Sequence, residues 1–204
     1  LVLLNEEENR VEDAEALAAA GLSCHTSMPV SVADTAEMVR SIGRAVRRPE
    51  AAEEIAGEIE RRATRVQAAA AGRKAVRYAY LIWRDPIMTV NDDTFVAALL
   101  GLAGGANVFG DAGERYPTVG PEELAAADPD GVLLSTEPFP FDVSYRDELV
   151  AVTGLPVERF RIVDGELLSW HGSRTPAGID YAGKVVEELR GAGVRPESDG
   201  AASG

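Results

Sequence analysis

The stretch Pro49-Glu-Ala-Ala-Glu-Glu-Ile-Ala-Gly-Glu-Ile-Glu-Arg-Arg-Ala-Thr-Arg-Val-Gln-Ala-Ala-Ala-Ala71 decides the fold of this chain. Its apolar side chains recur every three or four residues, which predicts one long amphipathic helix: Ile55, Ile59, Ala63, Val66 and Ala70. Pro49 suits a first helical turn, where its missing N–H would have no partner anyway. At 1.5 Å per residue the helix would be roughly 35 Å long, about the width of a small domain. We therefore expect it to run between two lobes or along the back of both.

Strand and helix patterns alternate on both sides of this helix. Before it, the periodicity predicts strands at 1–4 and 22–26 and helices at 9–20 and 31–46. After it, we expect strands at 75–83, 108–109, 131–135 and 160–163, and helices at 94–102, 121–127, 144–152 and 175–190. The helix from residue 94 would be capped by Asp92 or Asp93. Such alternation implies crossover connections and mainly parallel sheets.

The predicted fold class is α/β, with two lobes of mainly parallel sheet joined by one long backbone helix. The expected domains are residues 1–47 (amino-terminal lobe), 48–73 (connecting helix), 74–194 (carboxyl-terminal lobe) and 195–204 (a disordered polar tail). Because the chain opens directly in an apolar run, we expect the first lobe to be truncated at its amino terminus.

Composition narrows the function classes. The 204 residues carry a formal net charge of −14, which disfavours nucleic acid as a partner because phosphate binding needs a basic face. One cysteine, Cys24, provides neither a disulfide framework nor a cysteine zinc site. No apolar run approaches the ~20 residues that span a bilayer.

The motifs of common enzymes are missing from the sequence. It contains no glycine-rich dinucleotide fingerprint, no phosphate-binding loop with lysine and no Gly-x-Ser-x-Gly elbow. His25 and His171 share no metal-ligand spacing, so we expect no resident metal or cofactor. The acidic run Glu6-Glu7-Glu8 has two interpretations, a helix start favoured by the macrodipole or part of a ligand edge after a strand.

Three predicted loops combine an aromatic side chain with a neighbouring cation. They are residues 83–89 (Trp-Arg-Asp-Pro-Ile-Met-Thr), 115–118 (Arg-Tyr-Pro-Thr) and 169–174 (Ser-Trp-His-Gly-Ser-Arg). In a parallel sheet, loops after the strands meet at one edge, where ligands bind. Their composition suits a flat or polyanionic ligand, with Arg84, Arg115 and Arg174 as candidate anion contacts.

Several runs together resemble a known protein family. They are residues 83–89, Gly104-Gly-Ala-Asn-Val-Phe109, Arg115-Tyr-Pro-Thr-Val-Gly-Pro-Glu-Glu123, Asp128-Pro-Asp-Gly-Val-Leu-Leu134, and a supporting match over 163–174. They resemble the helical-backbone periplasmic binding proteins, the cobalamin- and iron-siderophore-binding components of ABC importers, and especially the cobalamin-binding branch. The resemblance covers about residues 1–190. It implies two α/β lobes on a rigid helix, with the ligand in the cleft between them.

The resemblance also implies functional residues. Met88, Tyr116 and the region of Trp170 match cleft loops, while Asn5 occupies a position where the cobalamin binders can carry an aromatic residue. Trp83 would compensate for that departure. The complete set of candidate ligand-binding residues is Asn5, Trp83, Arg84, Met88, Arg115, Tyr116, Trp170, His171 and Arg174.

The family docks onto its permease through an exposed glutamate on each lobe. Glu122 matches the second-lobe glutamate, and Glu123 is the alternative one residue along. The ordinary interpretation of both is an acidic first turn after Pro121.

The sequence therefore predicts an extracytoplasmic, monomeric solute-binding component of an ABC importer that performs no chemistry. Its ligand would be a corrinoid such as cobalamin, or alternatively a ferric siderophore or haem. Contact with the membrane would come only through the permease, or through a lipid anchor outside this chain. Two other hypotheses are a metallocluster- or chelatase-like α/β enzyme, which needs a cysteine or histidine set in the cleft, and a degenerate fragment without binding activity.

Overall fold

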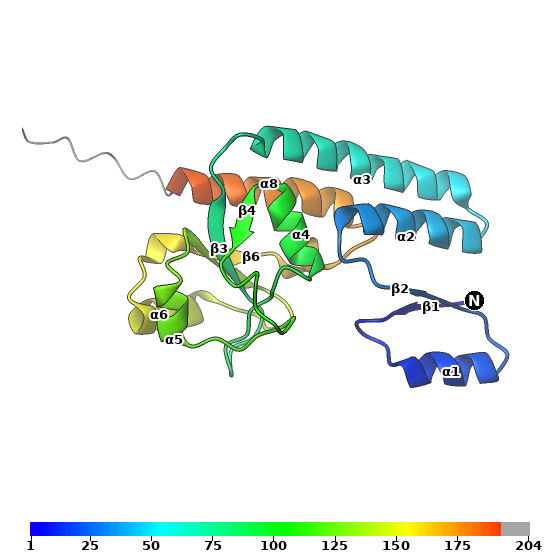
Figure 1. Cartoon of the computed structure of the whole chain (residues 1–204), viewed down its shortest axis with the longest axis horizontal. Helices are drawn as coiled ribbons and strands as arrows, with labels where there is room; N and C mark the ends of the chain where they lie inside the picture. The colour runs from blue at the N-terminus through cyan, green and yellow to red at the C-terminus, as the bar shows by residue number, and fades with distance from the viewer. Residues whose placement is uncertain (193–204) are drawn as a thin grey trace, which may run out of the picture.

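A computed structural model describes residues 1–192 as an α/β protein with two parallel sheets (Figure 1). The tail expected at 195–204 lies outside the described residues, as do the last two residues of the predicted second lobe. Within residues 1–192, no helix combines the length and apolar character needed to cross a bilayer. The α/β class with parallel sheets and a long helix is thereby confirmed.

The amino-terminal unit consists of β1 (Val2–Asn5), α1 (Val11–Ala19) and β2 (Cys24–Ser27). The two strands pair in parallel, with Val2 opposite Cys24. Gly21 follows α1 with φ +77°, a left-handed conformation that favours glycine after a helix. None of the residues of α1 is buried. We call residues 2–27 the β1–α1–β2 unit.

A helical layer along one side of the molecule consists of two antiparallel helices, α2 (Val32–Ala45) and α3 (Pro49–Ala70) (Figure 1). The Ser31 hydroxyl accepts a hydrogen bond from the Asp34 N–H at 3.0 Å and so caps α2. The helices approach so closely that a Cβ on Gly43 would lie 2.1 Å from the Cβ of Ala52. Arg40 adds ion pairs to Glu53 and Glu60 at 2.8 and 2.7 Å. The 22-residue α3 confirms the helix predicted from the periodicity.

The second sheet has the order β4-β3-β5-β6, and its strand pairs are all parallel. Its strands are β3 (Val76–Leu81), β4 (Gly105–Asn107), β5 (Gly131–Ser135) and β6 (Phe160–Val163). The helices that accompany it are α4 (Phe95–Leu102), α5 (Pro121–Ala126), α6 (Val143–Thr153), α7 (Gly165–Ser169) and α8 (Thr175–Ala192), with a short 3₁₀ turn at Val157–Arg159.

Apolar residues cover both faces of this sheet. On one face, Tyr78, Tyr80 and Leu133 pack in a cluster with residues of α4 and α8. On the other face, Leu81 and Leu134 pack with residues of α5 and α6. The first cluster also contains buried residues of the helical layer: Val32, Ala36, Ala56 and Ile59. α2 and α3 therefore share one continuous core with the second sheet.

Several predicted boundaries are wrong. The strand expected at 108–109 lies earlier, at β4, because the small Gly105 allows close packing on Tyr78: a Cβ there would lie 2.8 Å from its ring. The strand expected to reach Trp83 ends at Leu81. Thr94, rather than Asp92 or Asp93, caps α4 by accepting from the Ala97 N–H at 3.4 Å. α7 and the 3₁₀ turn have too few residues to show a helical period.

Candidate ligand-binding cleft

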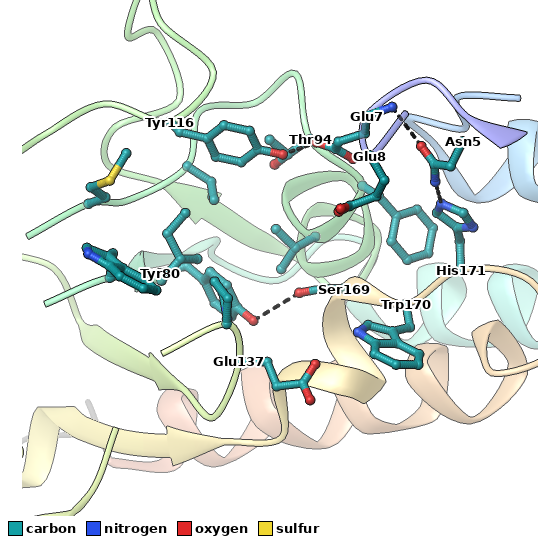
Figure 2. A pocket seen from close by; sticks show the side chains of 17 residues that line it. Asn5, Glu7, Glu8, Tyr80, Thr94, Tyr116, Glu137, Ser169, Trp170 and His171 are labelled. Carbon is teal, nitrogen blue, oxygen red and sulfur yellow. Dashed lines mark hydrogen bonds between the residues drawn. The ribbon is translucent and has the colours of Figure 1, made fainter. Parts of the chain in front are cut away.

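A cavity of about 790 Å³ lies between the loop that follows β1 and the loops of the second sheet (Figure 2). Its lining consists of Asn5, Glu7, Glu8, Tyr80, Ile82, Trp83, Met88, Val90, Thr94, Phe95, Val96, Tyr116, Glu137, Pro138, Ser169, Trp170 and His171. Small-molecule and cofactor sites occupy roughly 300–1,000 Å³ and combine apolar walls with a few polar groups. The volume and composition of this cleft are typical of such a site.

The cleft forms because strands of both sheets end beside it. Asn5 is the last residue of β1, Ile82 and Trp83 follow β3, and Glu137 follows β5. Ser169, at the end of α7, reaches the same edge from beyond β6. Ligands of open α/β sheets bind at the carboxyl ends of strands. The predicted convergence of three loops is confirmed, because each contributes at least one residue to the lining.

The apolar wall is built on a short antiparallel turn. Trp83 forms a bridge with Met88, and Met88 forms a second bridge with Thr118, two residues after Tyr116. Trp83 also makes an edge-to-face contact with Phe139, with ring centroids 5.8 Å apart. Trp83 and Trp170 are nevertheless 42% and 49% exposed. Large aromatic rings that stay half-exposed in a cavity offer surface for a flat ligand.

Asn5 and His171 connect the first strand to the second lobe across the cleft (Figure 2). The Asn5 side-chain amide donates a hydrogen bond to Nε2 of His171 at 2.9 Å. The imidazole also contacts the Phe95 ring edge-to-face at 5.8 Å. Burial lowers the pKa of His171 below its ordinary value, and the nearby Glu7 carboxylate only partly opposes this shift. The neutral imidazole is thus the form that suits this contact.

A second polar contact joins the two sides at Glu7. Its carboxylate accepts a hydrogen bond from the Tyr116 hydroxyl and forms an ion pair with Nε of Arg115 at 3.3 Å. Arg115 also lies 3.9 Å from Asp93. The acidic run therefore contributes directly to the cleft, through Glu7 and Glu8, which supports the ligand-edge interpretation of that run.

The floor of the cleft is a buried hydroxyl network. The hydroxyl of Tyr80 lies 2.8 Å from Oγ of Ser135 and 3.3 Å from Oγ of Ser169. Burial raises the pKa of Tyr80, so the phenol is protonated and acts as a hydrogen-bond partner. Oγ of Ser135 donates to the Glu137 carbonyl at 2.5 Å. This network fixes the start of the loop that carries Glu137.

Six of the nine predicted ligand-binding residues line the cavity: Asn5, Trp83, Met88, Tyr116, Trp170 and His171. The other three, Arg84, Arg115 and Arg174, lie outside its lining, although Arg84 follows Trp83 directly, Arg115 precedes Tyr116 and Arg174 lies three positions after His171. Arg84 pairs with Glu148 at 3.1 Å and stacks on Tyr145. Arg174 pairs with Glu166 and lies over the Trp170 ring, 5.1 Å from its centroid. These cations serve intramolecular partners, and a ligand-binding role for the other six stays a prediction.

Sequence reasoning missed several lining residues. Tyr80 and Phe95 are apolar positions in a strand and a helix, and nothing in the sequence distinguishes them from core residues. Glu137 could have been found, because it follows a predicted strand at the same sheet edge as the loops. Within residues 1–192, no group of three or more His, Cys, Asp or Glu side chains is placed to hold a metal ion. The expected lack of a resident cofactor stays a prediction.

Glu122 and Glu123 lie in the first turn of α5, on the second lobe. Both are exposed. The Glu123 carboxylate accepts a weak hydrogen bond from the Gly120 N–H at 3.4 Å, and no side-chain partner of Glu122 is found within residues 1–192. The two glutamates are accessible on the surface, outside the cavity lining.

Comparison with known proteins identifies the family to which this architecture belongs. The family described as "Periplasmic binding protein" matches residues 1–151. The chain belongs to this family. Among curated periplasmic binding proteins, the vitamin B12-binding protein of Vibrio cholerae O395 is 22% identical over 170 residues, which are 83% of this chain and 60% of that protein. The chain thus spans about 60% of the length of the curated relatives it matches.

Solved structures of periplasmic binding proteins share the fold. The vitamin B12-binding protein BtuF of Vibrio cholerae has a TM-score of 0.75 and 19% identity, with 95% of this chain and 74% of that chain covered. The heme-binding protein RhuT of Roseiflexus sp. RS-1, in its apo form, has a TM-score of 0.78 and 22% identity, covering 94% and 76%. The TM-scores show a common fold, and at identities below 25% the similarity shows the fold alone.

Proposed function

We propose that this chain belongs to an extracytoplasmic solute-binding protein that captures a corrinoid in the cleft and delivers it to the permease of an ABC importer. The observation that carries the proposal is the cavity of about 790 Å³ with half-exposed Trp83 and Trp170 in its lining. Burial of flat apolar surface against such rings is a strong source of affinity. The protein performs no chemistry in this proposal, and it acts as a monomer.

A second candidate ligand is haem, bound in the same cleft. Support comes from the name of RhuT and from a phenol and an imidazole in the lining, Tyr116 and His171. Both groups are side chains that proteins use as haem-iron ligands. In this chain, however, the Tyr116 hydroxyl donates to Glu7 and Nε2 of His171 accepts from Asn5, so both would have to give up a partner.

Tryptophan fluorescence tests the proposal directly, because both tryptophans of the chain line the cleft. We expect saturable quenching when the 204-residue chain is titrated with dicyanocobinamide or cobalamin. Free N-acetyltryptophanamide at equal absorbance corrects for light absorbed by the ligand. A Trp170→Leu variant should bind at least about fivefold more weakly, since it loses stacking surface worth about 1 kcal/mol or more. Quenching that only follows the free-tryptophan control, with corrinoids and haem alike, would remove the proposal.

The proposed delivery step uses Glu122, or Glu123, as the contact of the second lobe with the permease. Exposed carboxylates attract arginines on a partner and mainly change the rate of association. We expect Glu122→Arg to weaken binding to the cognate permease in detergent while leaving ligand affinity unchanged. Glu114→Arg, an exposed acidic position in the loop before α5, is the matched control. Equal permease binding by Glu122→Arg, Glu123→Arg and the control would exclude both glutamates.

A further inference from the structure

The ionisable groups of the cleft lining have one sign. Glu7, Glu8 and Glu137 are three carboxylates, His171 is an imidazole whose pKa is lowered by burial, and no lysine or arginine among residues 1–192 belongs to the lining. The site is identified by its cavity and aromatic lining, and the charge of the three carboxylates is a second, independent observation about the same cavity. The sequence favoured a flat or a polyanionic ligand, and this pattern opposes the polyanionic alternative.

The three carboxylates are not equivalent. The Glu7 carboxylate forms an ion pair with Arg115 and accepts a hydrogen bond from the Tyr116 hydroxyl. Glu8 and Glu137 have no side-chain hydrogen bond or ion pair with any residue in the range 1–192; Glu137 takes part only through its backbone. Glu8 extends from the β1 side and Glu137 from the loop after β5, so each side of the cleft presents one free carboxylate (Figure 2).

The three arginines of the predicted loops already form ion pairs with glutamates of the chain. Arg115 is committed to Glu7, Arg84 to Glu148, and Arg174 to Glu166. An anionic ligand would therefore have to break an ion pair to gain a counter-charge. It would also face two uncompensated carboxylates, and the repulsion between like charges grows as a bound ligand displaces water.

A bound ligand must also satisfy these carboxylates. When water leaves an ionised oxygen, the oxygen needs a donor in its place, and N–H donors to carboxylates make strong hydrogen bonds. We propose that the cleft selects a neutral or cationic chelate whose rim carries N–H donors, with Glu8 and Glu137 accepting from two sides, and that it discriminates against chelates with a carboxylate rim. This inference rests on the proposed function and specifies the chemical class of the ligand: a macrocycle with a primary-amide periphery.

A matched pair of corrinoids tests this selection, because the ring and metal are constant and only the rim changes. Dicyanocobinamide carries primary amides, and dicyanocobyrinic acid carries carboxylates in their place. We expect the amide form to bind at least about tenfold more tightly at pH 7.5, because hydrogen bonds to a charged acceptor are stronger than those between neutral groups. The preference should shrink as salt screens the rim charges.

Two variants assign the preference to residues. Glu8→Gln with Glu137→Gln should reduce the amide-over-carboxylate ratio at least about fivefold, and Glu137→Lys should raise affinity for cobyrinic acid. Glu6→Gln is the control, because Glu6 belongs to the same acidic run but lies outside the lining. The substituted carboxylates have no side-chain partners within residues 1–192, so unchanged thermal midpoints should show that the fold is intact.

The outcomes separate this inference from the proposed function. Corrinoid binding with no preference for the amide rim, or a preference unchanged in the double variant, would overturn the selection and leave corrinoid binding in place. If neither corrinoid binds, cobalt protoporphyrin and its diamide provide the same comparison on another ring. Preference for the diamide would then support the selection while removing the corrinoid. Preference for the dipropionate, or no binding of either, would overturn it.

Discussion

The tripeptide Val-Leu-Leu occurs in two strands of this chain, and the two copies have different environments. In β5, Val132, Leu133 and Leu134 are fully buried, between β3 on one side and β6 on the other. In β1, Leu3 is 50% exposed, and within residues 1–192 the strand pairs with β2 alone. The same tripeptide thus forms a strand in both places, but elements from distant parts of the chain determine how far its side chains are buried.

The largest expected effect comes from truncating the same leucine in each copy. Leu133→Ala should lower the free energy of unfolding by about 2–5 kcal/mol, because it leaves a cavity in a close-packed core. Leu3→Ala should lower it by less than about 1 kcal/mol, since half of that side chain already contacts water. Urea unfolding followed by circular dichroism measures both. Equal losses would mean that Leu3 is buried in solution and would cancel the comparison.

A second, smaller effect tests the packing of α2 on α3 in the helical layer, which follows the β1–α1–β2 unit in the chain. Gly43→Ala should destabilise by about 1–3 kcal/mol, because its Cβ would overlap Ala52 and force α2 away from α3. Gly57→Ala is the matched control. Its Cβ would meet only the flexible end of Arg61, at 3.1 Å, and alanine gains up to about 1 kcal/mol of helix propensity. Thermal unfolding should move the two midpoints in opposite directions, and a stabilised Gly43→Ala would disprove the close approach.

The smallest effect concerns protonation of His171, which links β1 to the second lobe. Its folded pKa is lowered, whereas the unfolded imidazole keeps an ordinary pKa of about 6.5. The unfolded chain therefore binds the proton first as pH falls, so stability is full above this value and declines below it until the folded pKa is passed. The protonated ring could no longer accept from Asn5.

NMR titration of His171 measures this shift, and a His25→Gln variant assigns the signal, because the chain has two histidines. Asn5→Asp should raise the His171 pKa, since a carboxylate favours the imidazolium. The difference in thermal midpoint between this variant and the parent should therefore favour the variant more at pH 5.5 than at pH 8. An ordinary His171 pKa in the parent chain would show that the imidazole is exposed to water in solution.

Much of the fold follows from local sequence. The spacing of Ile55 and Ile59 with the residues after them predicts α3 because a helical period is a property of neighbours along the chain. The aromatic loops are predictable for a related reason: once strands are parallel, the loops after them share an edge. The strand at 108–109 was misplaced because β4 is short and built on Gly105, without an apolar run to mark it.

The sequence by itself determined the alternation of elements, the long helix and the edge where a ligand would bind, since each depends on residues close in the chain. Only the tertiary structure decided the charge of that edge. Tyr116 and Glu7 meet across 109 positions, and Arg115 is neutralised by the same carboxylate. Such pairings depend on how two lobes are placed in space. The predicted loops carry arginines, yet the cleft presents Glu8 and Glu137 as its free charges.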